Sequence, residues 1–303
     1  IGCGFVGSSS AFALMQSGLF SEMVLIDADT DRAEGEAMDI SHGISFARPM
    51  QIYAGNYDDI ADAAIIVITA GANQKPGETR LDLIKKNAAI MKSIVGEIKK
   101  RDFGGIIVSN PVDILTLIAL KESGYPANRV IGSGTVLDTG RFKYLLGEHL
   151  AIDSRSVHAF IIGEHGDSEL AAWSNATIGG LSVNEFCELR GHFNHEASMK
   201  RIFDDVKNSA YEIIERKHAT YYGIAMAVKR ICEAIVRNEK SILPVSSLMT
   251  GEYGLNDVVL SIPSVVGETG VEKVVPIGLN NDEMSELRKS ADILKNIAAD
   301  YIS

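Results

Sequence analysis

The sequence predicts an α/β protein, in which a doubly wound parallel sheet is followed by a second domain of mixed α+β structure. Apolar runs closed by turn residues alternate with helical stretches over the first 134 residues, which is the pattern of parallel strands and crossover helices. This alternation of apolar runs and helical stretches ends near Thr135, so we divide the chain into two domains, 1–134 and 135–303. The 46% hydrophobic content of the 303 residues suffices for one large core or two moderate ones.

Four strands are expected in the first domain, because four apolar runs end in turn or acidic residues: 23–29, 63–72, 104–113 and 128–134. Continuous apolar runs of this kind indicate strands that are covered on both faces. Helices are expected between them, for example over 8–17 and over 83–100, where Ile84, Ala88 and Met91 begin an apolar face.

In the second domain we expect a helix over 137–150, an alternating strand over 156–162, and helices over 198–238 and 282–301. The chain begins at Ile1, directly before a glycine motif that ordinarily follows a strand. We therefore expect most of a first strand to be missing from the chain.

The overall charge and the cysteines exclude several classes of protein. A net charge of −11 disfavours nucleic acid or an anionic membrane surface as a partner. Cys3, Cys187 and Cys232 are far apart and form no Cys/His cluster, which predicts neither a metal site nor a disulfide framework. No apolar run approaches the roughly 20 residues of a membrane span, and no signal peptide precedes the first motif. We expect a cytoplasmic protein.

The segment Gly2-Cys3-Gly4-Phe5-Val6-Gly7 matches the pattern GxGxxG. A helical stretch follows it, and the next strand reaches Asp27, which lies 20 positions after Gly7. Glycines let a pyrophosphate approach the backbone and a helix N-terminus, and the acid binds the ribose hydroxyls of the adenosine. A carboxylate here repels a 2′-phosphate, so NAD is favoured over NADP. The alternative is that Asp27 only caps a turn.

Three further stretches carry polar residues that could react with a ligand. Residues 71–83 leave a strand as a polar loop with Arg80, and Ser109–Asp113 closes the next strand. Both follow strand ends, where open α/β sheets bind ligands. Asp138 and Arg141 lie three apart on one face of a helix.

The segment GEHGDSE places His165 in a polar loop. A loop histidine is more often structural than catalytic, and an Asp–Arg pair on a helix is usually a surface salt bridge. Arg80 could likewise be an ordinary loop cation, and the SNPVD segment a simple turn. All of these alternatives would have to be true at once for the segments to have no catalytic role. We therefore predict that His165 is a catalytic acid/base.

Five segments together resemble the L-lactate dehydrogenase branch of the lactate/malate dehydrogenase family: GCGFVGSS, TAGANQKPGETRLDL, VSNPVD, GTVLDTGRF and GEHGDSE. They occur in the family's order and cover nearly the whole chain. The resemblance implies a Rossmann NAD-binding domain, a catalytic domain, and reversible hydride transfer between NADH and pyruvate that yields L-lactate.

The resemblance also implies a role for each polar residue. His165 would exchange the proton with the substrate oxygen, and histidine suits this task because its pKa lies near working pH. Asp138 would orient the ring and favour its charged form. Arg141 would hold the substrate carboxylate through a paired hydrogen bond. Arg80 would polarise the carbonyl when its loop closes.

Cofactor contacts are implied in the same way. Asn110 would donate to the substrate oxygen beside the nicotinamide, and Ile224 would pack on its other face. The further implied contacts are Gly2, Gly4, Val6, Gly7, Asp27, Arg32, Tyr57, Gly71, Ala72, Val108, Ser109 and Ser133.

Substrate choice within the family depends on Gln74 and Thr220. An arginine at position 74 would pair a second carboxylate and give a malate dehydrogenase. Neutral Gln74 favours pyruvate, because a dicarboxylate would leave a buried charge without a counter-ion. Other 2-hydroxyacid dehydrogenases, for malate or branched acids, and a non-catalytic dinucleotide-binding protein are the alternatives.

Regulation is a further expectation from the resemblance. Many bacterial members of the family are activated by fructose 1,6-bisphosphate, which is bound between subunits by an arginine two positions after the substrate arginine and by a histidine in the following strand. His158 is present here, but Lys143 stands at the arginine position. Either the activator binds, or both residues are polar interface groups. A homotetramer is the expected assembly.

Overall fold

The computed structural model describes residues 1–72, 80–101, 103–109 and 112–301. Its central sheet has the strand order β13-β12-β5-β4-β3. Three of these strands are parallel: β3 (Ile65–Ile68), β4 (Ile106–Ser109) and β5 (Val130–Gly132). Two strands from the second half of the chain extend the sheet in antiparallel fashion, β12 (Ser246–Thr250) and β13 (Asn256–Ser261).

The chain start connects this sheet to a second strand pair, the parallel β1 (Glu22–Leu25) and β2 (Gln51–Ala54). The Ile1 amine donates to the carbonyl of Val67 at 2.7 Å, and the Ile1 carbonyl accepts from the Thr69 N–H at 2.8 Å. The Gly2 N–H donates to Ile26 at 2.7 Å. Residues 1–2 therefore lie between β1 and β3, and the parallel part of the sheet is doubly wound.

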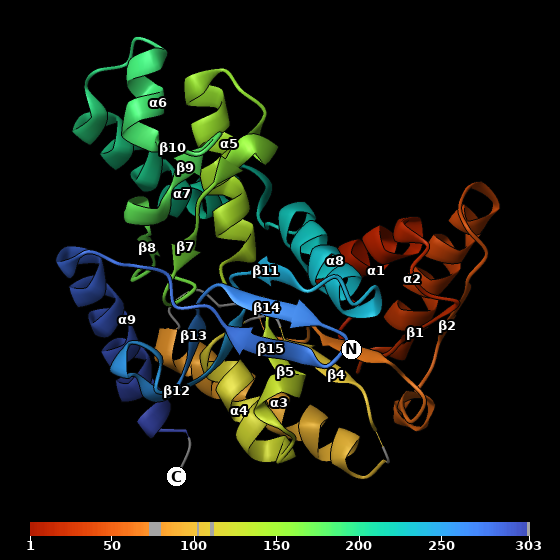
Figure 1. Ribbon diagram of the computed structural model, residues 1–303. Coiled ribbons are helices and arrows are strands. Elements are labelled where there is room, and N and C mark those ends of the chain that lie inside the picture. The colour runs from red at the N-terminus through yellow and green to blue at the C-terminus, as the bar shows by residue number, and fades with distance from the viewer. Residues whose placement is uncertain (73–79, 102, 110–111, 302–303) are drawn as a thin grey trace.

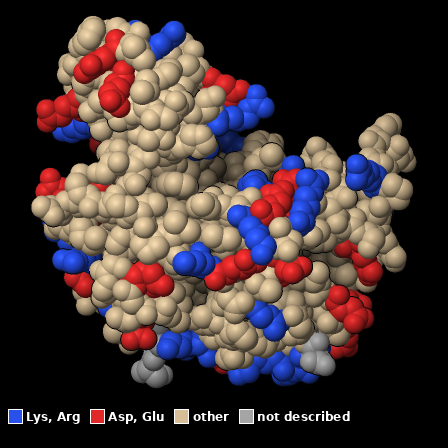
Figure 2. Space-filling model, viewed as in Figure 1, with Lys and Arg blue, Asp and Glu red and all other residues tan. Residues whose placement is uncertain are grey.

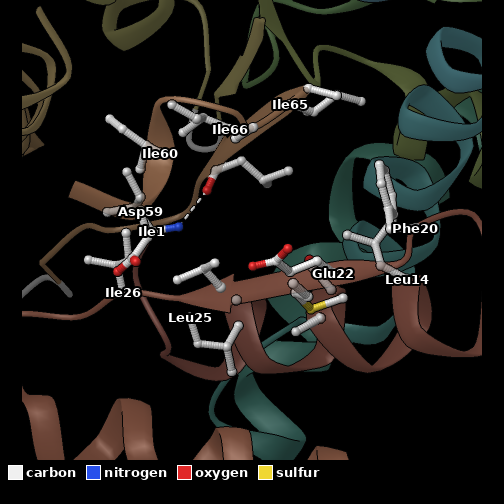
Figure 3. Close-up of a pocket in the computed structure, with 18 of the residues that line it drawn as sticks. Ile1, Leu14, Phe20, Glu22, Leu25, Ile26, Asp59, Ile60, Ile65 and Ile66 are labelled. Carbon is white, nitrogen blue, oxygen red and sulfur yellow. Dashed lines mark hydrogen bonds between the residues drawn. The ribbon is translucent and has the colours of Figure 1, made fainter. Parts of the chain in front are cut away.

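A cavity of about 540 Å³ continues between β1 and β3 beside these residues. Figure 3 shows Ile1, Leu25 and Ile26 at one end of it, and Leu14, Phe20 and Ile65 toward the other. The cavity reaches the amino ends of β1 and β3. It is therefore a space within the sheet, on the opposite side from the carboxyl ends where α/β sheets bind their ligands.

Helices cover both faces of the sheet (Figure 1). On one face α1 (Phe5–Ser17) packs against α8 (Tyr222–Val236), and on the other α3 (Arg80–Lys99) packs against α4 (Ile114–Ser123). Helix α2 (Thr30–His42) lies against β2, and α9 (Asn281–Ala299) lies against β13. The buried surfaces between these layers are aliphatic, as the continuous apolar runs predicted.

A second lobe rises above the sheet in Figure 1. It contains α5 (Val136–Leu150), α6 (Val183–Leu189) and α7 (His195–Lys217). Its core is built on the fully buried Phe142, whose ring meets Trp173 edge-on at 4.7 Å. Its short strands are β6 (Val157–His158), β7 (Ile161–Ile162), β8 (Leu170–Ala171), β9 (Thr177–Ile178) and β10 (Leu181–Ser182).

The remaining elements complete the described chain. Strands β11 (Ser241–Leu243), β14 (Ser264–Gly267) and β15 (Gly270–Val274) form a small antiparallel sheet next to α8. The 3-10 turns are Gly43–Phe46, Tyr57–Ile60, Ala127–Arg129, Ser154–Ser156, Trp173–Asn175 and Glu252–Gly254. No helix among the described residues has the length and apolar character needed to cross a membrane. Acidic and basic side chains are interspersed on the face shown in Figure 2.

Two expectations from the sequence were wrong in detail. The strand expected over 156–162 is two strands, because β6 pairs with β9 and β7 pairs with β8. The helical region 198–238 is interrupted between α7 and α8, where His218 adopts a left-handed backbone conformation with φ 66°. The alternation of 156–162 runs across the first break, so it could not reveal where hydrogen-bonding partners change.

Candidate active site

A histidine and two charged residues of α5 form a compact polar group. The Nδ1 atom of His165 lies 2.6 Å from Oδ2 of Asp138. The other oxygen of Asp138, Oδ1, accepts a hydrogen bond from Nη1 of Arg141 at 2.7 Å. The Asp138 side chain is buried, whereas that of His165 is 37% exposed. Nε2 of His165 is therefore the ring nitrogen left to exchange a proton with a ligand.

The loop that carries His165 is attached to the sheet through backbone atoms. Gly163 and Ser261 exchange two backbone hydrogen bonds of 2.9 Å, and the Glu164 N–H donates to Oγ of Ser290 at 2.8 Å. The His165 N–H itself donates to Oδ2 of Asp113 at 2.6 Å. These contacts fix the loop between the second lobe and the carboxyl end of β4.

Asp113 is a positioning residue that the sequence did not single out. It precedes α4 with φ 59°, a backbone conformation that is unfavourable for a residue other than glycine. Its second oxygen accepts a hydrogen bond from Oγ of Ser246 on β12 at 2.5 Å. Burial raises the pKa of Asp113 to about 6, although the hydrogen bonds from Ser246 and His165 oppose the rise.

The charges around His165 decide its protonation. Burial alone would lower the pKa of the ring, but the Asp138 carboxylate outweighs it, with help from Asp113 and Glu169, and the pKa rises to about 9. Burial alone would raise the pKa of Asp138, but His165 and Arg141 outweigh it and lower that pKa. At neutral pH the pair is therefore an imidazolium and a carboxylate.

A third acid lies beside this pair. Oxygen or nitrogen atoms of Asp138, His165 and Glu169 lie within 4.8 Å of one another, a spacing that could also hold a metal ion. The Arg141 guanidinium already supplies a cation to Asp138, so the group fits a proton-transfer site better than a metal site. Glu169 belongs to the GEHGDSE segment, but its neighbours in sequence did not reveal that it is buried.

The glycine segment has the geometry of a dinucleotide-binding loop. A Cβ at Gly7 would lie 1.8 Å from the Gly2 carbonyl, and one at Gly2, which has φ +95°, would lie 2.4 Å from the Ala70 nitrogen. A Cβ at Gly4 would instead enter open space at the start of α1. Glycine is thus needed at two positions for close packing, and the third leaves the space in front of the helix N-terminus open, where such loops receive a pyrophosphate.

Asp27 connects this loop to β1. Its Oδ2 accepts from the Cys3 N–H at 2.5 Å, and its Oδ1 accepts from the Asp29 N–H at 2.9 Å. The carboxylate is therefore held at the mouth of the glycine loop, where it would bind the ribose hydroxyls of NAD. The residues present fit that cofactor.

Other predicted cofactor residues fall into two groups. Val6 and Ile224 pack in one apolar cluster between α1 and α8. Val108, Ser109 and Ser133 are buried at the carboxyl ends of β4 and β5, where the Ser133 N–H donates to Ser109. The remaining four positions have other surroundings: Gly71 is exposed after β3, the Ala72 N–H bonds Asn87, Arg32 lies 3.8 Å from Asp29, and Tyr57 lies under the guanidinium of Arg101.

Several predicted substrate residues cannot be placed in the same way. Gln74 and Asn110 lie outside the described residues. Arg80 is described only as the first residue of α3, so the loop cation of the sequence prediction begins a helix. Thr220 is half-buried in the short link before α8.

A dinucleotide-binding loop, a histidine–aspartate pair and a neighbouring arginine are together typical of an oxidoreductase with a nicotinamide cofactor. Comparison with known proteins makes the class specific. Residues 1–132 match the family model of the lactate/malate dehydrogenase NAD binding domain, and residues 135–302 match that of the alpha/beta C-terminal domain. The chain belongs to the lactate/malate dehydrogenase family. This confirms the predicted fold class and NAD as the cofactor.

Individual relatives are similar over nearly their whole length. The L-lactate dehydrogenase of Acetivibrio thermocellus is 55% identical over 299 residues, which are 98% of this chain and 94% of the relative. L-lactate dehydrogenase 1 of Clostridium acetobutylicum is 56% identical over 297 residues, 97% and 95% of the two chains. The minor L-lactate dehydrogenase of Enterococcus mundtii in its ligands-bound form superposes with a TM-score of 0.95 at 47% identity, covering 98% of this chain and 95% of that one.

We expect Asp138→Asn to lower the pKa of His165 from about 9 toward the ordinary value of about 6.5. The amide keeps the shape of the carboxylate but removes its charge. Titration of the His165 ring by NMR measures the change, and Asp153→Asn, which removes an exposed carboxylate bonded to Arg155, is the control. A ring pKa that stays near its original value would show that Asp113 and Glu169, rather than Asp138, keep the His165 ring protonated.

Proposed function

We propose that the protein is an NAD-dependent L-lactate dehydrogenase, which reduces pyruvate to L-lactate and runs in both directions. The observation that carries this proposal is the His165–Asp138 contact at 2.6 Å with Arg141 on the same carboxylate. Relatives more than 50% identical over nearly the full chain are named L-lactate dehydrogenases. Its fermentative role in glycolysis and its cytoplasmic location are part of the same proposal.

The reaction divides between the cofactor and the chain. NADH supplies the hydride for the carbonyl carbon of pyruvate. The His165 imidazolium donates its Nε2 proton to the carbonyl oxygen, and the neutral ring recovers a proton when L-lactate is oxidised. Asp138 stays ionised and holds the ring through Nδ1. Arg141 binds the substrate carboxylate through the N–H groups that it does not give to Asp138.

The loop residues complete the proposed site. Arg80 and Asn110 would bond the carbonyl oxygen, and closure of the loop would exclude water. Gln74 and Thr220 would set the preference for pyruvate over a dicarboxylate. The proposed domain boundary lies between residues 134 and 135. The glycine loop then belongs to domain 1–134, and His165, Asp138 and Arg141 belong to domain 135–303.

We expect rapid NADH oxidation at 340 nm with pyruvate and little with oxaloacetate. Gln74→Arg should reverse this order, because a second arginine pairs the second carboxylate; a change of about a hundredfold in the ratio of the two kcat/KM values corresponds to a few kcal/mol. A wild-type preference for oxaloacetate would favour malate as the substrate. Activity with neither acid despite NADH binding would favour a bulkier 2-oxo acid or a non-catalytic protein.

His165→Ala should retain NADH binding, measured by fluorescence, and lose at least about a hundredfold in kcat, because the proton donor is absent. In the wild type, pyruvate reduction should decline as pH rises through about 9, where the imidazolium is lost, and lactate oxidation should gain over the same range. Wild-type rates in the variant would remove His165 from the mechanism.

We propose activation by fructose 1,6-bisphosphate in a homotetramer, with contacts from Lys143 and His158. His158 is exposed on β6, and burial lowers the pKa of the half-buried Lys143. We expect the sugar bisphosphate to lower the KM for pyruvate several-fold, and Lys143→Ala to abolish that effect while basal kcat persists. An unchanged KM would assign both residues to an interface between subunits, which sedimentation analysis would reveal.

A further inference from the structure

Glu169 is a buried acid of the active site that the proposed mechanism does not use. It ends the loop that carries His165, directly before β8, and is 7% exposed. Its carboxyl group lies within 4.8 Å of both a His165 ring nitrogen and an Asp138 oxygen. Three acids therefore surround one histidine: Asp138, Asp113 and Glu169.

The charges facing Glu169 come from three elements. Helix α5 contributes Asp138 and Arg141, the loop contributes His165, and α7 contributes Lys207. Asp138 already pairs with His165 and Arg141 through its two oxygens. The Lys207 ammonium lies over the Phe203 ring, 5.1 Å from its centre. Within the described residues, no side chain donates a hydrogen bond to the Glu169 carboxyl group.

These surroundings disfavour a negative charge on Glu169. Burial raises the pKa of its carboxyl group to about 8, with a further contribution from Asp138 that His165, Lys207 and Arg141 oppose. Glu169 is then a neutral carboxylic acid at pH 7 and ionises close to the range in which His165 loses its own proton.

We propose that Glu169 is a positioning residue whose own proton is required for the anionic substrate to bind. As a neutral acid it leaves Arg141 and His165 as the net positive groups that attract a carboxylate. As a carboxylate it adds a second negative charge beside that of Asp138, which cancels this net positive charge. This inference rests on the proposed function, because it requires an anion at Arg141.

The size of the effect follows from the geometry. Two like charges that are close together in a partly buried site repel each other enough to weaken binding by about tenfold or more. Removal of the Glu169 charge also lowers the pKa of His165 somewhat. At alkaline pH this second effect weakens substrate binding, whereas loss of the direct repulsion strengthens it. Loss of the direct repulsion is the larger of the two effects.

The test is the pH profile of kcat/KM for pyruvate between pH 6 and 10 at saturating NADH, in the wild type and in Glu169→Gln. Both values should fall as His165 loses its proton, and between pH 7 and 10 the wild-type value should fall about tenfold further than the variant value, because Glu169 ionises as well. At pH 9 the KM of the variant should be about fivefold lower than that of the wild type. At pH 6.5 its kcat and KM should stay within about twofold.

Asp167→Asn is the matched control, because it removes a negative charge from the same loop at an exposed residue that bonds Tyr211. Its profile should follow the wild type. A Glu169→Gln profile that falls as steeply as the wild-type profile would overturn the inference, while pyruvate reduction at pH 6.5 leaves the proposed function intact. If Glu169→Gln fails to fold, the wild-type profile decides alone: a decline about tenfold larger than one proton loss supports the inference, and a decline that one proton loss explains overturns it. Absence of pyruvate turnover at pH 6.5 in the wild type would instead contradict the proposed function.

Discussion

The sharing of one buried carboxylate between a histidine and an arginine is the interaction on which the site depends. Asp138 contacts His165 at 2.6 Å and Arg141 at 2.7 Å, so one negative charge orients both the proton donor and the cation for the substrate. A buried carboxylate is unfavourable unless its oxygens are satisfied. Here both partners satisfy it, and the rise in the pKa of His165 follows from the same contact.

The other two acids show how differently the same side-chain chemistry behaves in one region. Asp113 accepts hydrogen bonds from Ser246 and from the His165 backbone, which reduce the effect of its burial, whereas Glu169 has no such donors among the described residues. A carboxyl pKa raised by folding means that the ionised form is less stable in the folded protein than in the unfolded chain. Stability from these two groups is therefore fully present in acid and is lost as pH rises through about 6 for Asp113 and about 8 for Glu169.

The positions of these acids depend on contacts between segments that are far apart in the chain. Asp113 follows β4 in the first domain, contacts the loop of the second lobe, and bonds Ser246 of β12. Strands β12 and β13 return from the second half of the chain to extend the first sheet beyond β5. The unfavourable backbone of Asp113 persists because these contacts hold it from three directions.

The sequence by itself determined the fold class, the glycine loop with Asp27, and the face shared by Asp138 and Arg141, because these features depend on local periodicity and short spacings. It also indicated His165, through the resemblance of five segments to one family. Only the tertiary structure decided that β12 and β13 join the first sheet, that β6 and β7 separate, and that Asp113 and Glu169 lie beside His165. Strand pairing and the burial of an acid depend on contacts between residues far apart in the chain, and no local pattern encodes these contacts.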